Sequence, residues 1–197
     1  MKQIFSFGLT AALLLACLTG CGGQAGGAAP GGTAPSGGQT PPASSAPETP
    51  AGEISREEAL AIALANAGVP EGDAYNVKNE TDSDNGIPLY DIEFETDYGD
   101  YDFEVAIADG RIVGADYEVD EEWLDALGGS PVTAEEAASI VAGKVSGASA
   151  ADVDIWEESG DGRGRYEGEL FLDGMKYEFE LDPRTGRIFD WTADLRD

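Results

Sequence analysis

The second half of the chain repeats the pattern of the first half, and this duplication limits the possible folds more than any other feature. Three blocks recur in the same order: residues 54–59 (ISREEA) return as 132–137 (VTAEEA), 101–105 (YDFEV) as 177–181 (YEFEL), and 110–112 (GRI) as 186–188 (GRI). The first block recurs 78 positions later and the other two recur 76 positions later. Matched blocks at a nearly constant offset indicate a tandem duplication of one structural unit.

Each copy is predicted to open with a helix. Ser55 with Glu58, and Thr133 with Glu136, form capping boxes, in which a hydroxyl and a carboxylate satisfy the free N–H groups of a helix start. Apolar residues then follow at helical spacing: Ala59, Ile62, Ala63 and Ala67 in the first copy, and Ala137, Ile140, Val141 and Val145 in the second. Gly68 and Gly147 are predicted to end these helices in the left-handed conformation.

The helices are followed by segments that alternate apolar and acidic residues, as in 90–95 and 101–108. This period of two is typical of antiparallel strands with one face on a core and one in water. Asn85-Gly86 marks a hairpin turn, and shorter strands are predicted around 75–80 and 153–158. The predicted fold class is therefore α+β, with two tandem repeats that each pack a helix on a roughly four-stranded antiparallel sheet. Residues 120–127 are predicted to form a short connecting helix that ends at Gly128-Gly129.

The start of the chain has the pattern of an export signal. Lys2 is followed by an apolar run that reaches Ala16 and is too short to remain in a bilayer as a spanning helix. The segment ends in Leu18-Thr19-Gly20-Cys21, which resembles the lipobox of bacterial lipoproteins. The resemblance implies cleavage after residue 20 and a diacylglyceryl group on Cys21, and two acyl chains are enough for stable attachment. The alternative is an ordinary signal peptide with a chance cysteine.

The organisation predicted for the chain has five parts. Residues 1–20 are the lipoprotein signal peptide, and 21–52 are a disordered tether, because a Gly-, Pro- and Ala-rich segment cannot bury enough apolar surface to fold. Residues 53–119 are the first repeat, 120–130 the connecting helix, and 131–197 the second repeat. We therefore expect a monomeric protein held on the outer side of a bacterial cell membrane, facing the extracellular or periplasmic space.

Several kinds of chemistry are excluded by residue types that the mature chain lacks. The sequence has no histidine, and its two cysteines lie in the signal (Cys17) and at the lipid attachment site (Cys21). Histidine bases, cysteine nucleophiles, disulfides and thiolate metal sites are thus unavailable, and we expect a protein that is not an enzyme and has no cofactor and no metal site. The net charge of −28 opposes binding to nucleic acid, because phosphates require basic residues.

The strand pattern places the carboxylates on one face of each repeat. These are Asp91, Glu93, Glu95, Asp102 and Glu104 in the first copy, and Glu167, Glu169, Glu178 and Glu180 in the second. Such a face keeps a protein soluble, but it can also dock a basic partner or attract calcium. The three tryptophans, Trp123, Trp156 and Trp191, are expected to lie in the seam between the repeats, with exposed interface anchors as the alternative.

The order of these motifs resembles the PepSY domain. The helix opening I/V-S/T-x-E-E-A, the paired Y-x-F strands and the turn in residues 182–188 (DPRTGRI) carry the resemblance, and both copies show it. It implies an α+β module of secreted peptidase propeptides and envelope proteins, without a known catalytic residue. The leading hypothesis is therefore a lipid-anchored regulator or inhibitor of an extracytoplasmic peptidase. Calcium binding or sensing, and a structural role in the envelope, are the alternatives.

Overall fold

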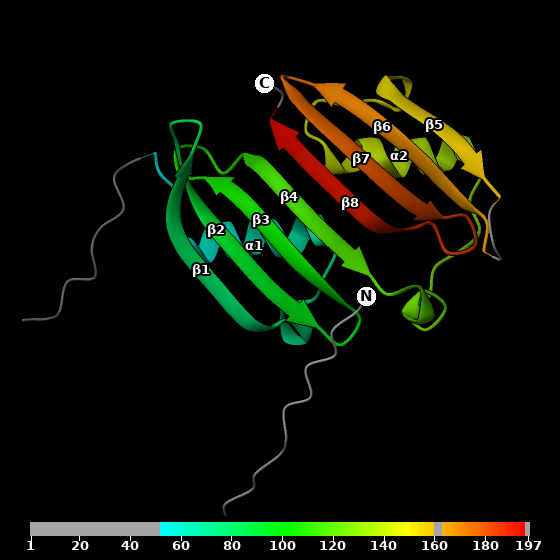
Figure 1. Ribbon diagram of the computed structural model, residues 1–197, viewed down its shortest axis with the longest axis horizontal. Helices are drawn as coiled ribbons and strands as arrows, with labels where there is room; N and C mark the ends of the chain where they lie inside the picture. Colours follow the sequence, from blue (N-terminus) through cyan, green and yellow to red (C-terminus); the bar gives the residue numbers. More distant parts are fainter. Residues whose placement is uncertain (1–51, 160–162, 196–197) are drawn as a thin grey trace, which may run out of the picture. The chain divides into compact units, whose positions relative to one another are not determined.

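The computed structural model describes residues 52–159 and 163–195. Two helices and eight strands follow one another in two similar series (Figure 1). The elements are α1 (Arg56–Ala67), the short 3-10 helix η1 (Glu71–Asp73), β1 (Tyr75–Asp84), β2 (Ile87–Thr96), β3 (Gly99–Ala106), β4 (Ile112–Val119), η2 (Glu121–Trp123), α2 (Ala134–Lys144), η3 (Ala150–Asp152), β5 (Val153–Glu158), β6 (Arg165–Leu172), β7 (Met175–Asp182) and β8 (Arg187–Leu195). The predicted fold class, α+β with one helix and four strands in each repeat, is confirmed.

Both helices begin at the predicted capping boxes. The Glu58 carboxylate accepts a hydrogen bond of 2.8 Å from the backbone N–H of Ser55, and Glu136 accepts one of 2.8 Å from Thr133. Helix α1 also ends as predicted, at Gly68 with a φ of 72°. Helix α2 ends two residues earlier than predicted, with its cap at Val145, which is extended and turns into the core. The predicted stop at Gly147 is therefore wrong.

The eight strands form one antiparallel sheet in the order β1-β2-β3-β4-β8-β7-β6-β5. The prediction gave each repeat a sheet of its own, and this is corrected by the pairing of β4 with β8. These two strands are the last strands of their repeats, and each would otherwise be an open edge with unpaired backbone groups. Their pairing leaves only β1 and β5 as edges of the sheet.

The two repeats meet around a local two-fold axis. Residues 76 positions apart are equivalent in the two sheets, and the equivalent pair Asp116 and Thr192 lie opposite each other in the β4–β8 ladder. Tyr117 then lies opposite Trp191, the equivalent of Ala115. An antiparallel ladder that is centred on a pair of equivalent residues has two-fold symmetry. The two repeats are therefore related in the same way as the two subunits at an isologous dimer interface. Helices α1 and α2 consequently cover the same face of the sheet (Figure 1).

One hydrophobic core runs beneath both helices. Its largest fully buried side chains include Trp191, Phe94 and Phe103, and Tyr101, predicted to face the core, is only 4% exposed. The rings of Phe94 and Tyr101 stack with their centroids 4.7 Å apart. The core is continuous across the β4–β8 seam, so the repeats share their interior.

The segment between the repeats is not the predicted connecting helix. Only Glu121–Trp123 form a short 3-10 turn, after which Leu124 is fully buried. The chain then passes so close to the β7–β8 turn that a Cβ on Gly129 would lie 2.0 Å from the Thr185 carbonyl oxygen. Burial of one leucine and this close backbone approach, both tertiary effects, leave no room for further helical turns.

Candidate functional site

Cys21, the predicted lipid attachment residue, lies outside the described residues, as do the predicted signal peptide and nearly all of the predicted tether. Its lipid modification stays a prediction from the sequence. Within 52–159 and 163–195, no helix is both long and apolar enough to span a bilayer.

The face of the sheet opposite the helices is lined by carboxylates over all eight strands. The residues predicted to share this face do so, since Asp91 pairs with Glu104, Glu93 with Asp102, and Glu178 with Thr192. The β4–β8 junction makes the two predicted acidic faces continuous. The acidic residues of this acidic face are Glu80, Asp82, Asp91, Glu93, Glu95, Asp100, Asp102, Glu104, Asp116, Glu118, Asp154, Glu158, Glu167, Glu169, Glu178, Glu180, Asp190 and Asp194.

The carboxylates of the acidic face repel one another. Burial, followed by the charges of Asp91 and Glu93, raises the pKa of Asp102 above its ordinary value. Burial and neighbouring carboxylates likewise raise the pKa of Glu104 and of Asp190. Like charges across neighbouring strands destabilise a sheet, so repulsion on the acidic face lowers the stability of the fold.

The middle of the first repeat's acidic surface is hollowed. A depression of about 740 Å³ is lined there by Lys78, Glu93, Asp102 and Asp116, among others. Oxygens of Asp91, Glu93 and Asp102 lie within 4.8 Å of one another, a spacing at which carboxylates can hold a divalent cation. Because Lys78 already forms an ion pair with Glu93, and none of the three side chains is buried, we assign no metal site there.

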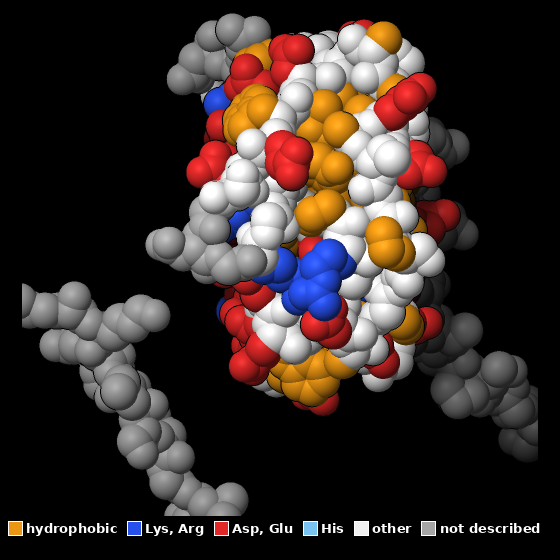
Figure 2. Space-filling view, turned by 90° about the vertical axis from the view of Figure 1, so that its right-hand side faces the viewer, with side chains coloured by type: hydrophobic (Ala, Val, Ile, Leu, Met, Phe, Trp, Pro, Cys, Tyr) orange, Lys and Arg blue, Asp and Glu red, His pale blue; other side chains and the backbone are white. Residues whose placement is uncertain are grey.

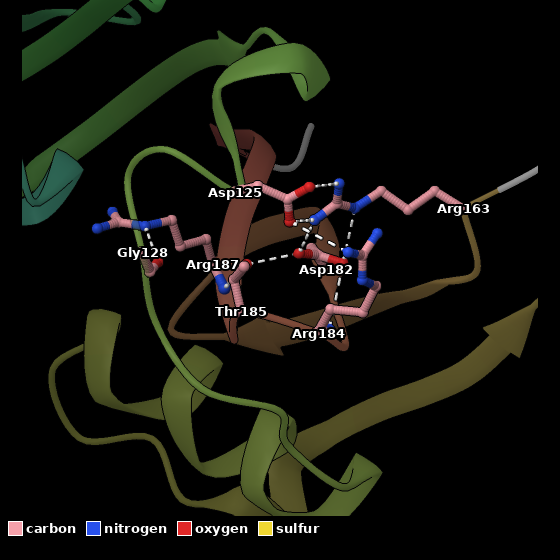
Figure 3. Close-up of polar contacts among 7 residues, drawn as sticks. All are labelled: Asp125, Gly128, Arg163, Asp182, Arg184, Thr185 and Arg187. Atoms are coloured by element: carbon pink, nitrogen blue, oxygen red, sulfur yellow. Dashed lines mark hydrogen bonds and ion pairs between the residues drawn. The ribbon is translucent and has the colours of Figure 1, made fainter.

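A second polar cluster is centred on Asp182, which is fully buried (Figure 3). Its carboxylate accepts hydrogen bonds from Arg163 Nε at 3.0 Å, Arg163 Nη2 at 2.6 Å and Thr185 Oγ1 at 2.6 Å. Burial alone would raise the pKa of Asp182, but the hydrogen bonds from Arg163 and Thr185 outweigh it and leave the pKa below its ordinary value. A buried carboxylate satisfied by this many donors stays charged and fixes their positions.

The Asp182 cluster attaches the segment between the repeats to the second sheet. Arg163 also binds Asp125 at 3.0 Å, and Arg187 Nε donates to the Gly128 carbonyl at 2.8 Å. In Figure 2 the largest group of basic side chains lies near the middle of this face, with a few more at its left edge, whereas acidic side chains are spread over the face. In the first repeat the residue equivalent to Asp182 is Ala106, which packs in an apolar cluster. Because alanine fills this position in one repeat, we interpret the Asp182 cluster as structural.

A pocket of about 460 Å³ lies between the repeats, beside the ends of α1 and α2. Lys144 and Asn66, which are equivalent residues 78 positions apart, meet there across the local two-fold axis. Asn66 Nδ2 donates to the Lys144 carbonyl at 3.1 Å, and Lys144 Nζ donates to the Asn66 carbonyl. The apolar part of the wall includes Met175, Tyr177 and Trp191.

The Lys144 amine is largely buried and has no carboxylate partner among the described residues. Its nitrogen lies 5.0 Å from the ring centre of Tyr117 and 4.9 Å from that of Trp191. Burial lowers the pKa of Lys144 to about 7. Aromatic faces attract a cation, and so do the carbonyl ends of helices, so these neighbours act against the effect of burial.

The three tryptophans differ in their surroundings. Trp191 is 2% exposed at the β4–β8 seam, as predicted, whereas Trp123 and Trp156 are 37% and 47% exposed. The expected burial of Trp123 and Trp156 is therefore wrong. Trp123 lies on the irregular segment between the repeats. Trp156 lies on the solvent face of the edge strand β5, opposite Glu167 of β6.

Comparison with protein families identifies the class of this chain. The family model described as "Peptidase propeptide and YPEB domain" (PepSY) matches residues 53–116 and again 131–192. The chain therefore belongs to the PepSY family and carries two copies of its domain. No curated protein matched the sequence.

Two solved structures are similar in part. The Bacillus megaterium YpeB C-terminal domain has 8% sequence identity over 73% of this chain, with a TM-score of 0.46, and this chain spans 64% of its length. A Clostridium difficile 630 protein described as a candidate lipoprotein has 15% identity over 72% of this chain and 94% of its own, with a TM-score of 0.29.

The sequence did not single out the residues that the structure brings together most closely. Lys144, Asn66 and Arg163 were assigned no role, because their partners lie far along the chain. The 78-residue offset does make Lys144 the equivalent of Asn66. This equivalence predicts a contact between Lys144 and Asn66 only when the pairing of β4 with β8 is known.

Proposed function

We propose that this protein is a lipid-anchored, extracytoplasmic PepSY protein that binds and regulates a secreted or membrane-bound peptidase, and that it acts by binding and not by catalysis. The observation that carries the proposal is the match of both repeats to a family described by peptidase propeptides. The lipobox-like Leu18-Thr19-Gly20-Cys21 supports the anchor and its location outside the cytoplasm.

The acidic face is the contact surface that we propose for this partner. It is wide because the two sheets are joined, and among its described residues Lys78, Arg165 and Lys176 are the basic ones, each paired with a glutamate. A surface of one charge favours a partner of the opposite charge and accelerates its association. The partner is therefore expected to present a basic surface, and its affinity is expected to fall as ionic strength rises.

The partner surface is tested with residues 45–197, which hold the complete core and both repeats. This fragment is used to capture extracytoplasmic proteins, and candidate peptidases are then assayed with it. A triple variant, Asp91→Asn, Glu93→Gln and Asp102→Asn, is expected to lose capture and any effect on activity. The matched control removes three exposed acidic charges outside the sheet, with Glu57→Gln, Glu71→Gln and Glu135→Gln, and is expected to behave like the wild type. Equal binding by both triple variants would exclude the acidic face, and the absence of any captured peptidase would count against the function.

The anchor is tested separately in cells. The full chain and its Cys21→Ser variant are expressed in a bacterium that processes lipoproteins, and labelling with a radioactive fatty acid is followed. Label and membrane attachment are expected for the wild type and not for the variant. Equal labelling of both proteins, or of neither, would contradict the assignment of Cys21.

A further inference from the structure

The pocket between the repeats collects the basic side chains that the rest of the protein leaves without acidic partners. Among the described residues, Lys78, Arg163, Arg165, Lys176 and Arg184 form ion pairs with carboxylates. Arg56 and Arg187 are bound by neutral oxygens instead. Lys144 and the guanidinium of Arg111 make no ion pair within the described ranges, and both line this pocket. Two unpaired cations in one pocket are notable in a chain of net charge −28.

Lys144 retains donor capacity that the protein does not use. An ammonium group carries three N–H donors, and the carbonyl oxygen of Asn66 accepts one of them. The faces of Tyr117 and Trp191 lie beside this amine and offer no strong acceptor. A ligand oxygen that entered the pocket would thus meet a donor whose hydrogen-bonding capacity is incomplete.

The Asn66 amide is not available to a ligand, although Asn66 lines this pocket. Its Nδ2 donates to the Lys144 carbonyl at 3.1 Å, and its Oδ1 is buried and receives no hydrogen bond from the described residues. A buried acceptor without a donor is costly to the fold, but an oxygen without accessible surface cannot meet a ligand N–H.

The remaining wall is suited to an apolar side chain. Ile62, Leu172 and Tyr177 are half-buried and line it, and Met175 and Trp191, each 2% exposed, lie behind them. The volume of about 460 Å³ lies in the range of small-ligand sites, which are mainly apolar with a few placed polar groups. Asp109 and Asp173 also line the pocket, both as exposed turn residues, and they disfavour a ligand with several negative charges.

We propose that this pocket binds a carboxylate that carries an apolar group, as at the C-terminus of a peptide that ends in an apolar residue or in a short fatty acid. The carboxylate is bound by Lys144 and Arg111, and the apolar group packs on Ile62, Leu172 and Tyr177. One negative charge and one apolar group are what these residues complement. The inference is independent of the proposed function, because it concerns the other side of the sheet and a different partner chemistry.

The test compares two small probes, N-acetyl-Ala-Phe with a free carboxylate and its C-terminal amide. Their binding to residues 45–197 is measured by calorimetry near pH 6.5, where Lys144 is mostly protonated. The acid is expected to bind about tenfold tighter or more, which corresponds to one charge-assisted hydrogen bond. Hexanoate, which has a carboxylate and an apolar chain but no peptide unit, separates the two sources: tighter binding than the acid probe assigns a fatty acid, and weaker binding assigns a peptide C-terminus.

Two pocket variants and one control complete the test. Lys144→Met and Arg111→Gln are each expected to remove or reduce the preference for the acid over the amide. Arg184→Gln removes an exposed arginine outside the pocket and is expected to bind the probes as the wild type does. Arg111 is an exposed side chain, so its variant tests the pocket without changing a buried group. The proposal would be overturned if neither the acid probe nor hexanoate binds, if acid and amide bind equally, or if both pocket variants keep the preference.

Discussion

Replacing Lys144 by methionine is expected to stabilise the protein at neutral and acidic pH. Methionine keeps the length of the side chain and the apolar contacts but removes the buried charge. Burial lowers the pKa of Lys144 from 10.5 to about 7. At about 1.4 kcal/mol for each pH unit, this corresponds to a cost of about 5 kcal/mol for the charged amine. The faces of Tyr117 and Trp191 return about 0.5–2 kcal/mol each, which leaves a cost of about 1–4 kcal/mol.

The sign of the pH dependence follows from the direction of this pKa shift. Between pH 7 and 10.5 the amine is protonated in the unfolded chain but mostly neutral in the folded protein. The unfolded state then binds more protons, so the wild type gains stability as the pH rises through this window. The Met variant lacks this gain. Asp109, Arg111, Asp173, Tyr117 and Tyr177 also face the pocket, and they are present in both proteins.

The assay is urea unfolding of residues 45–197, followed by tryptophan fluorescence at about pH 6 and about pH 9.5, either side of the shifted pKa. Lys144→Met is expected to exceed the wild type at the lower pH, and its advantage is expected to shrink by about 1–4 kcal/mol at the higher pH. The hydrogen bond that the variant loses at the Asn66 carbonyl is stronger when the amine is charged, so it reduces the advantage of the variant at the lower pH. Lys78→Met, at an exposed site, is the control and should show no such advantage. An advantage that changes by less than about 0.5 kcal/mol between the two pH values would refute the reasoning.

Three further substitutions test the structural arguments by urea or thermal unfolding. Asp182→Ala leaves Arg163 without its buried partner and is expected to lower the free energy of unfolding by about 3–5 kcal/mol. Asp125→Ala is expected to lower it by less than about 1 kcal/mol. Similar losses in the two variants would show that the burial of Asp182 is unimportant. Gly129→Ala should destabilise the protein more than Gly174→Ala. At Gly129 φ is +137° and the new Cβ would lie 2.0 Å from the Thr185 oxygen, whereas the new Cβ at Gly174 would have no atom within 4 Å. The reverse order of stability would contradict the packing described. Asp102→Asn should stabilise by up to about 1 kcal/mol at pH 7, because the raised pKa of Asp102 means that its charge opposes folding. That gain should fade as the pH falls through the pKa of Asp102, and a variant less stable at pH 7 would count against repulsion on the acidic face.

Local physics explains what the sequence alone determined. The capping boxes at Ser55 and Thr133 set both helix starts, because a cap depends only on residues three positions apart. The Asn85-Gly86 turn formed as predicted, with both residues at positive φ. Period-two alternation assigned residues 90–95 and 101–105 to the core and the solvent face correctly, but Ala106, expected on the solvent face, is buried in a small apolar cluster.

Predictions were wrong where long-range contacts outweighed local patterns. Val145 was expected to continue α2, but its burial in the core ends the helix. Residues 120–127 were expected to be helical, and the burial of Leu124 together with the tight approach of Gly129 to Thr185 prevented it. Neither effect leaves a signal in neighbouring residues.

The sequence by itself determined the repeat, the helix and strands of each copy, and the absence of histidine chemistry. Only the tertiary structure decided that β4 pairs with β8 and that the acidic face is continuous. It also decided that Lys144 meets Asn66 across a pocket. The physical reason is that a strand's pattern specifies which face is buried but not which edge is paired, because every edge offers the same backbone donors and acceptors.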